Sequence, residues 1–302
     1  MVVHEGREVP FSRGILSRTL TQAGASADLA YRVASEVRSE LLAEERWVIG
    51  EEEILARVRA KLSRLNPLVV SRMQKWRTLR ETTEPIIVLI GGATGVGTST
   101  LAADLARRLN IQSVVGTDSV REILRRAISP DLLSSLHRSS YNVRPEDIRV
   151  PVGSEDAVIS GFLSQAARVL VGVEALVDRG LKEGTNLVIE GVHLVPEMIP
   201  ARYRDHPNVC SLMVYLEDDK MHRDRFYVRA MGTAMRRPAE EYLAHFRQIR
   251  EIHDYLRHDA ERLGVRPVEN ISIDDASDAA AEIVLGRVAG LAARNRTEAT
   301  GR

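Results

Sequence analysis

The sequence predicts an α/β fold in which a parallel sheet is flanked by helices. From residue 85 onward, short apolar runs rich in β-branched residues alternate with longer segments of helical pattern. Such runs are typical of strands that are buried on both faces, and their alternation with helices indicates parallel pairing. Ligands of such sheets bind at the carboxyl ends of the strands. We therefore expect the functional residues to follow the strands.

The elements are expected in a regular order. Four strands are expected at "PIIVLIGG", "SVVGTD", "NLVIEG" and "CSLMVYLE", and "ENISID" is the last such run before the terminal helix. Helices are expected at "TSTLAADLARRLN", "SVREILRRAIS", "EDAVISGFLSQAARVLVGVEALVDRGLKEG" and "ASDAAAEIVLGRVAGLAA", with another long helix after the fourth strand. This order predicts a sheet covered by helices on both faces.

A change of pattern divides the chain into two parts. We expect a small helical module at residues 1–65, a linker helix at 66–84 and the α/β domain at 85–302. In the module, Ser26 or Asp28 is expected to cap a helix whose apolar residues recur at helical spacing, at Leu29, Val33, Val37 and Leu41. The module could bind nucleotide, mediate dimerisation or simply pack, so a homo-oligomer is left open.

The composition restricts the class of protein. Of the 302 residues, 44% are hydrophobic and 28% charged, and 42 basic residues balance 42 acidic ones, which disfavours a nucleic-acid binder that works by bulk charge. Cys210 is the only cysteine and is expected in the core, so a disulfide framework is excluded. We find no signal-peptide core and no segment that approaches the length of a membrane span. We expect a cytoplasmic protein without a membrane partner.

The stretch "IIVLIGGATGVGTST" has the form of a phosphate-binding loop. Gly92, Gly97 and Ser99 fit the pattern G-x-x-x-x-G-K-[ST], but Thr98 occupies the lysine position. Backbone N–H groups and the N-terminus of the following helix bind phosphate in such loops, and the Ser99 hydroxyl can ligate Mg²⁺. A glycine-rich turn without a ligand is the alternative. The residues expected to bind ATP are Gly92, Thr94, Gly95, Val96, Gly97, Thr98, Ser99 and Thr100.

A cation from elsewhere must replace the missing lysine. The segment "DDKMHRDRFYVRAMG" follows the fourth strand, where nucleoside-monophosphate and shikimate-type kinases carry a lid. Arg223, Arg225 and Arg229 are the candidates, and on a helix Arg225 and Arg229 share one face with His222 beside them. Closure of a lid would bring positive charge onto the transferred phosphoryl group. The alternative is a surface helix with ion pairs to its own aspartates.

Two carboxylates follow strands. "LVIEG" resembles a Walker B strand, so Glu190 is expected to hold Mg²⁺ together with Ser99, although a strand-ending turn is an alternative. Asp118 could cap the helix that begins near Ser119, and it could also orient or deprotonate an acceptor hydroxyl, since the two roles are compatible. His193, three residues after Glu190, is expected to face the same cleft, although a lone histidine is more often structural.

An acceptor site is expected beside Asp118. Arg121 and Arg125 lie four residues apart on one helix, where they could bind an anionic acceptor or form a solvated face. The segment "SSLHRSSYNVRPEDIRVPVG" is too polar for core and too long for a plain connection. Its cations and hydroxyl groups suit a small phosphorylated or carboxylated substrate, and an exposed loop is the alternative. The residues expected to bind substrate are Arg121, His137, Arg138, Ser140, Tyr141 and His193.

Four motifs in order carry a family resemblance. "IGGATGVGTSTLA", "GTDSVREILR", "LHRSSY" and "VIEGVHLVP" closely resemble the 2-phosphoglycerate kinases, in which the loop likewise reads GVGTST. "VPFSRGILSRTLTQAG" is similar to the ATP-cone-like module that these kinases carry. The resemblance implies a P-loop kinase fold and ATP-dependent phosphorylation of the 3-hydroxyl of 2-phosphoglycerate to 2,3-bisphosphoglycerate. It also implies that the threonine in the lysine position is a family trait.

We therefore expect an ATP- and Mg²⁺-dependent kinase for a small anionic alcohol, with Asp118, Arg225 and Arg229 in catalytic roles. Three alternatives remain at this stage. The acceptor could be another anionic alcohol, such as a sugar acid or an inositol phosphate. It could be a nucleoside or nucleotide, although few aromatic residues surround the acceptor segment. The protein could also be a regulatory nucleotide sensor that binds ATP without turnover.

Overall fold

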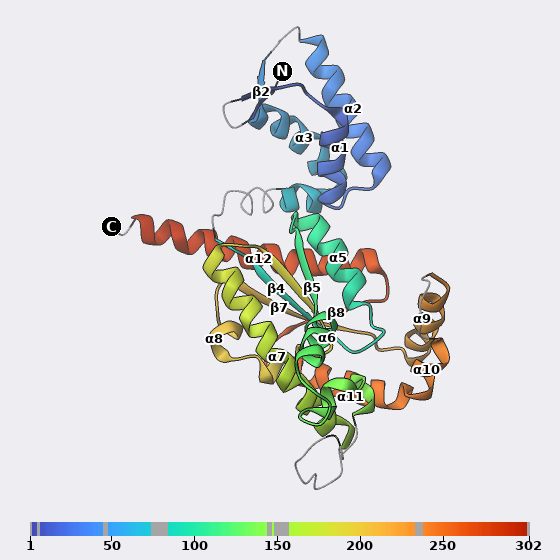
Figure 1. The fold of residues 1–302 in the computed structure, drawn as a ribbon. Coiled ribbons are helices and arrows are strands. Elements are labelled where there is room, and N and C mark those ends of the chain that lie inside the picture. Colours follow the sequence, from blue (N-terminus) through green and yellow to red (C-terminus); the bar gives the residue numbers. More distant parts are fainter. Residues whose placement is uncertain are drawn as a thin grey trace. The chain divides into compact units, whose positions relative to one another are not determined.

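The computed structural model describes residues 2–4, 7–44, 48–73, 84–143, 147, 157–232 and 238–300. Within these ranges, the side chains of residues 3–4, 7–8, 229–232 and 292–300 lie outside the description. The chain forms two compact units, Met1–Thr82 and Thr83–Arg302, which are drawn in Figure 1.

The first unit combines a small sheet with several helices. The sheet has the order β2-β1-β3, in which β1 pairs antiparallel with β2 and parallel with β3. These strands contain only two or three residues each, too few to produce a recognisable alternation, and sequence analysis did not predict them. The elements are β1 (Val2–His4), β2 (Arg7–Val9), α1 (Arg13–Gln22), α2 (Ala27–Ala43), β3 (Ile49–Gly50) and α3 (Glu51–Leu65). Residues 67–73 are also helical.

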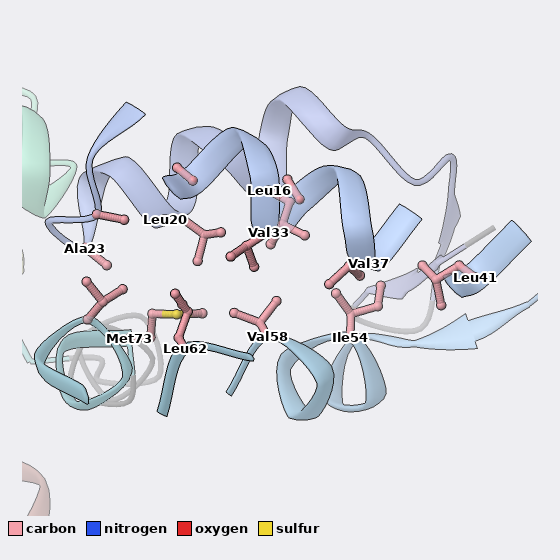
Figure 2. Close-up of a cluster of buried hydrophobic side chains, with 14 of the residues drawn as sticks. Leu16, Leu20, Ala23, Val33, Val37, Leu41, Ile54, Val58, Leu62 and Met73 are labelled. Atoms are coloured by element: carbon pink, nitrogen blue, oxygen red, sulfur yellow. The ribbon is translucent and has the colours of Figure 1, made fainter. Parts of the chain in front are cut away.

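One apolar cluster holds this unit together. Figure 2 shows side chains of α1 and α2 facing those of α3 across the cluster, with Val33 and Val58 completely or almost completely buried. The helical spacing predicted for α2 is confirmed, because Val33, Val37 and Leu41 all lie in this core. Ser26 is the N-cap of α2 and accepts a hydrogen bond from the Leu29 N–H at 3.3 Å. These contacts show that the unit has a core of its own.

The second unit is built on a five-stranded sheet of order β5-β6-β4-β7-β8, in which every pairing is parallel. The strand that leads into the glycine loop, β4, is therefore central. Its register with β6 pairs Ile90 with Glu190 and Gly91 with Gly191, which brings the ends of the two strands together. The strands are β4 (Ile87–Gly91), β5 (Ser113–Gly116), β6 (Leu187–Gly191), β7 (Val209–Tyr215) and β8 (Arg266–Glu269).

Helices cover both faces of this sheet, as predicted (Figure 1). On one face lie α5 (Thr98–Leu109) and α12 (Ile273–Thr300), and on the other lie α6 (Thr117–Ala127), α7 (Ala157–Glu183) and α11 (Phe246–Arg262). Further helices in the described part of this unit are η1 (Ser134–His137), η2 (Ser140–Asn142), η4 (Pro196–Met198), α8 (Ala201–Arg204), α9 (Asp219–Gly232) and α10 (Ala239–Ala244).

Helix α7 corrects one expectation about length. Its 27 residues are long and apolar enough to cross a membrane by length and composition, whereas sequence analysis found no such segment. Leu170, Val173 and Val177 of this helix pack with strand residues Ile87 and Ile189 in one core cluster. One face of α7 therefore packs in the core of the α/β unit.

The last strand begins earlier than "ENISID". Strand β8 ends at Glu269, so only the first residue of that run is in the strand, and α12 begins at Ile273. Asn270 consequently lies at the carboxyl end of the sheet, where its N–H donates to the Tyr215 carbonyl at 3.0 Å. Cys210 is buried in β7, as expected of a core residue, and burial raises the pKa of its thiol to about 11.

Candidate active site

The glycine loop lies between the end of β4 and the start of α5. Gly97 is the N-cap of α5 and has a φ of 97°, a left-handed conformation that favours glycine. A side chain on Gly92 would lie 2.7 Å from the Val214 carbonyl of β7, so the loop approaches the sheet as closely as glycine permits. The local geometry is that of a strand, a tight turn and a helix N-terminus, which together form a site for phosphate.

The carbonyl groups of this loop are bound from outside by two other elements. His222 of α9 lies 2.9 Å from the Thr94 carbonyl through its Nε2, and Arg225 Nη1 donates to the Val96 carbonyl at 2.8 Å. Asn270, after β8, donates its Nδ2 to the same Val96 carbonyl at 2.8 Å. Side chains that are far away in the sequence thus bind the carbonyl groups of this loop.

The lid arginines differ in their surroundings. Arg225 also donates to the carbonyls of Asn270 and Ile271, and a side chain on Gly97 would lie 3.1 Å from its Nη1. The Arg223 guanidinium instead stacks over the Phe246 ring at 4.3 Å from the centroid. The Arg229 side chain lies outside the described part of the structure. Of the lid arginines whose side chains are described, Arg225 is therefore the one next to the glycine loop.

His222 is a buried neutral contact for the loop. Its side chain has no solvent exposure and stacks on Phe226, with ring centroids 5.6 Å apart. Burial lowers the pKa of His222 to about 4, although the hydrogen bond to Thr94 opposes that shift. Arg250 Nη1 lies 3.4 Å from Nδ1, and because a guanidinium only donates, Nδ1 accepts and Nε2 carries the proton given to Thr94. We infer that His222 shapes the loop without adding positive charge.

The two residues expected to hold the metal lie together. Ser99 donates its hydroxyl to Glu190 Oε1 at 3.0 Å. A side chain on Gly116, at the end of β5, would lie 2.9 Å from the same carboxylate oxygen, so glycine leaves room for Glu190 there. A hydroxyl and a carboxylate fit a divalent cation that also binds phosphate and water. Among the described residues, no group of three or more His, Cys, Asp or Glu could hold a metal ion.

Asp118 lies two residues after Gly116, at the start of α6, but it is not a helix cap. Helix α6 begins at Thr117 and its N-cap is Gly116, so the capping interpretation of Asp118 is wrong. The carboxylate sits in the first turn, is 76% exposed and lies 3.3 Å from Arg121 Nε. Its position leaves it accessible to a ligand near the strand ends.

Arg121 is not part of a solvated helix face. Its side chain is 7% exposed, and its Nη1 donates to the Arg138 carbonyl in the acceptor segment. Arg125, one turn later, pairs with Glu122 at 2.9 Å on the surface. The two arginines therefore differ: Arg121 joins Asp118 to the acceptor segment, whereas Arg125 forms an ordinary surface pair.

The acceptor segment is partly buried, contrary to the prediction that it is too polar for core. Leu136 has no solvent exposure and packs with Val120 and Val169, because the 3₁₀ turn η1 directs it between α6 and α7. His137 Nε2 lies 3.0 Å from the Ile128 carbonyl at the end of α6, and Arg138 pairs with Asp147 at 3.2 Å. Residues 144–146 and 148–153 of the predicted segment lie outside the described residues.

A run of ring contacts joins the acceptor segment to the glycine loop. Tyr141 is 5% exposed and lies 6.0 Å from the Tyr242 ring, which stacks on Phe226 at 5.0 Å with planes 12° apart. A side chain on Gly95 would collide with Phe226. Ser140 beside Tyr141 is also buried. Aromatic residues are thus brought here from α9 and α10, although few occur near the segment in sequence.

His193 does not face the cleft. It has no solvent exposure, and its two ring nitrogens lie 2.9 Å from Thr117 Oγ1 and 3.0 Å from Gln165 Oε1. The turn after β6 directs the ring inward, beneath the start of α6. Gln165 and Thr117 were missed by sequence analysis, and the detectable signal for Gln165 was one amide on the apolar face of α7.

These features define the class of protein: an α/β P-loop kinase, with the loop after the central strand and a carboxylate at the end of the neighbouring one.

No protein-family model matches the chain. Curated 2-phosphoglycerate kinases do match. The protein of Methanopyrus kandleri is 42% identical over 271 residues, covering 90% of this chain and 82% of that protein. That of Methanocaldococcus jannaschii is 40% identical over 282 residues, covering 93% and 89%. The chain belongs to the 2-phosphoglycerate kinase family.

Solved structures of two kinases are similar at low identity. A gluconokinase from Sinorhizobium meliloti 1021 matches with a TM-score of 0.39 and 13% identity, covering 71% of this chain and 97% of that one. A shikimate kinase from Acinetobacter baumannii in complex with shikimate matches with a TM-score of 0.40 and 15% identity, covering 70% and 97%.

Proposed function

We propose that the protein transfers the γ-phosphoryl group of ATP to the 3-hydroxyl of 2-phosphoglycerate, giving 2,3-bisphosphoglycerate and ADP. Membership of the 2-phosphoglycerate kinase family carries this proposal, since relatives with that name cover most of the chain at 37–42% identity. The placement of Ser99, Glu190 and Asp118 at neighbouring strand ends supports it.

For the nucleotide, the N–H groups of the loop at residues 92–100 and the N-terminus of α5 would bind the phosphates. A kinase requires a divalent cation with its ATP, and Mg²⁺ is our specific proposal. Ser99 and Glu190 would hold it, and it would neutralise charge on the phosphates. Arg225 and Arg229 are proposed to replace the absent lysine. Arg225 is already beside Gly97, so a small shift would bring it to the phosphates.

For the acceptor, Asp118 would orient the hydroxyl and take its proton as the oxygen attacks the γ-phosphorus and the bond to ADP breaks. Arg121 and Arg138 would attract the anionic groups, and Arg138, with 42% of its side chain exposed, is the better placed for contact. His137, Ser140 and Tyr141 would shape the segment around the substrate. His193 would help to position the acceptor segment without contact to the substrate, because its side chain is buried. A cytoplasmic location and the ATP-cone-like nature of the first unit stay predictions.

The test is an assay of ADP release with Mg²⁺ and ATP against a panel of acceptors: 2-phosphoglycerate, 3-phosphoglycerate, glycerate, shikimate, gluconate, inositol phosphates and nucleoside monophosphates. We expect turnover with 2-phosphoglycerate, and a loss of about 100-fold or more in Asp118→Asn with ATP affinity unchanged. Turnover confined to another acceptor would reject the substrate and keep the kinase.

A nucleotide sensor is the second candidate, because a loop with Thr98 in the lysine position could bind ATP without turnover. The same experiment separates the two. ATP binding without turnover of any acceptor in the panel would reject the kinase and support the sensor.

A further inference from the structure

Three completely buried polar side chains connect the site of Asp118 with the acceptor segment. His193, Gln165 and Thr117 are each 1% exposed or less. They come from the turn after β6, from the first third of α7 and from the first residue of α6. Buried polar groups must be hydrogen-bonded to avoid a large desolvation cost, so their mutual contacts define how these three elements meet.

Two backbone carbonyls next to Gln165 determine the direction of each hydrogen bond, because a carbonyl can only accept. Gln165 Nε2 donates to the carbonyls of Ser135 and Arg138, the latter at 3.0 Å. This assigns the amide nitrogen, so Oε1 must be the atom that accepts from His193 Nε2 at 3.0 Å. His193 Nδ1 then lacks a proton and accepts from the Thr117 hydroxyl at 2.9 Å. One tautomer of a neutral imidazole satisfies every contact.

The surroundings of the ring agree with that neutral form. Burial lowers the pKa of His193 to about 4, with Asp118 opposing the shift and Arg121 adding to it. Gly191 makes the contact with Thr117 sterically feasible, because a side chain there, at a φ of 137°, would collide with Thr117 Oγ1.

The Arg138 carbonyl is where this network meets the proposed catalytic group. It accepts from Gln165 and also from Arg121 Nη1, and Arg121 Nε faces the Asp118 carboxylate at 3.3 Å. Asp118 directly follows Thr117 on α6. The acceptor segment is therefore held relative to Asp118 from two directions, and Gln165 is the group common to the Ser135 carbonyl, the Arg138 carbonyl and His193.

We propose that Gln165 is a positioning residue for phosphoryl transfer, which sets the distance between the acceptor segment and Asp118 through the two carbonyls and His193. It would not touch the substrate. The proposal rests on the proposed function for the identity of the acceptor, but not for the hydrogen-bond pattern. Misplacement of reacting groups by about 1 Å can cost roughly 100-fold in rate, so such a buried amide can govern turnover.

The test compares Gln165→Met, which keeps the length of the side chain and removes its hydrogen bonds, with Val177→Ala. The control also alters a buried residue of α7, but it packs against the sheet core. We expect Gln165→Met to raise the KM for 2-phosphoglycerate or lower kcat by about tenfold or more, with the KM for ATP unchanged. Val177→Ala should lower thermal stability and leave both KM values unchanged. Equal changes in both KM values, or no change in a folded Gln165→Met, would overturn the proposal.

A second readout uses ¹⁵N NMR of the His193 ring in the full chain. The wild type should show protonated Nε2 and unprotonated Nδ1. Gln165→Met should remove the preference for the tautomer protonated at Nε2. Thr117→Val should keep that tautomer and lower kcat less than Gln165→Met does. Thr117→Ser, which keeps the hydroxyl, should have the wild-type rate. The opposite tautomer in the wild type would overturn the proposal, whether or not Gln165→Met folds.

Failure of the proposed function gives a different pattern. If the wild type uses another acceptor from the panel, the kinetic comparison is made with that compound. If it uses none, the proposed function fails and the role of Gln165 in phosphoryl transfer fails with it, whereas the tautomer still reports on the hydrogen bonds.

Discussion

The glycine loop at residues 92–98 and the first part of the acceptor segment, residues 134–142, both have backbone carbonyls bound by buried or half-buried side chains. In the glycine loop, Arg225 and Asn270 donate to Val96. In the acceptor segment, Arg121 and Gln165 donate to Arg138.

The difference lies in the loops themselves. The glycine loop has positive φ angles at Gly95 and Gly97 and continues into a helix, so its conformation is largely local. The acceptor segment has two short 3₁₀ turns and a buried Leu136, and it depends on α6 and α7 for its conformation. We infer that local sequence specifies the nucleotide side and that tertiary contacts specify the acceptor side.

The largest expected effect is on turnover, and it comes from a side chain outside the glycine loop that binds the loop. We expect Arg225→Ala to lower turnover by roughly 10³-fold or more, because the cation that replaces the lysine would be lost. Arg223→Ala is the matched control on the same helix, since its guanidinium stacks on Phe246, and its turnover should stay near normal. Steady-state kinetics of both variants provides the measurement. Near-normal turnover in Arg225→Ala would mean that the lid assignment is wrong.

A pH experiment tests both regions together. Burial lowers the pKa of His193 and of His222 to about 4, from an ordinary value near 6.5. The unfolded chain takes up these protons as the pH falls from 6.5 to 4, whereas the folded chain does not. The free energy of unfolding should therefore decrease across that window, by on the order of 3 kcal/mol for each histidine. Urea unfolding at a series of pH values measures it, and equal stability at pH 7 and pH 4.5 would contradict the burial of both rings.

A smaller effect, on the free energy of unfolding, is expected from substitution of Gly191, which lies next to Thr117. Gly191→Ala should lower the free energy of unfolding by about 2–3 kcal/mol, because it adds strain at positive φ and a collision with Thr117. Gly184→Ala is the matched control, with a φ of 67° and open space around it, and should cost about 1 kcal/mol. Thermal unfolding of both variants is the measurement. Equal losses would show that Thr117 moves away at no cost.

The smallest effect concerns the metal on the nucleotide side. Ser99→Ala should raise the Mg²⁺ concentration needed for half-maximal activity by about tenfold, because one proposed ligand is lost while Glu190 remains. Activity measured against Mg²⁺ at a fixed ATP concentration reports this change. An unchanged Mg²⁺ requirement would remove Ser99 from the metal site.

Much of the fold was predictable because its signals are local. The strand of apolar residues before Gly91, the glycines that follow and the helix that begins at Thr98 occur where the pattern predicted them. The "LVIEG" strand likewise ends at the predicted position, and its parallel register with β4 brings Glu190 to Ser99. The first unit was predicted less completely, since strands of two or three residues leave no periodic signal.

By itself, the sequence determined the parallel α/β class, the glycine loop and the carboxylates at the strand ends, because strand periodicity and turn chemistry act over a few residues. Only the tertiary structure decided that Asn270 and Arg225 bind the loop, that His193 is buried and neutral, and that Gln165 joins it to the acceptor segment. The physical reason is that hydrogen-bond partners and desolvation depend on which elements meet in space. The amide of Gln165 and the carbonyl of Arg138 are 27 residues apart in the chain and 3.0 Å apart in the fold.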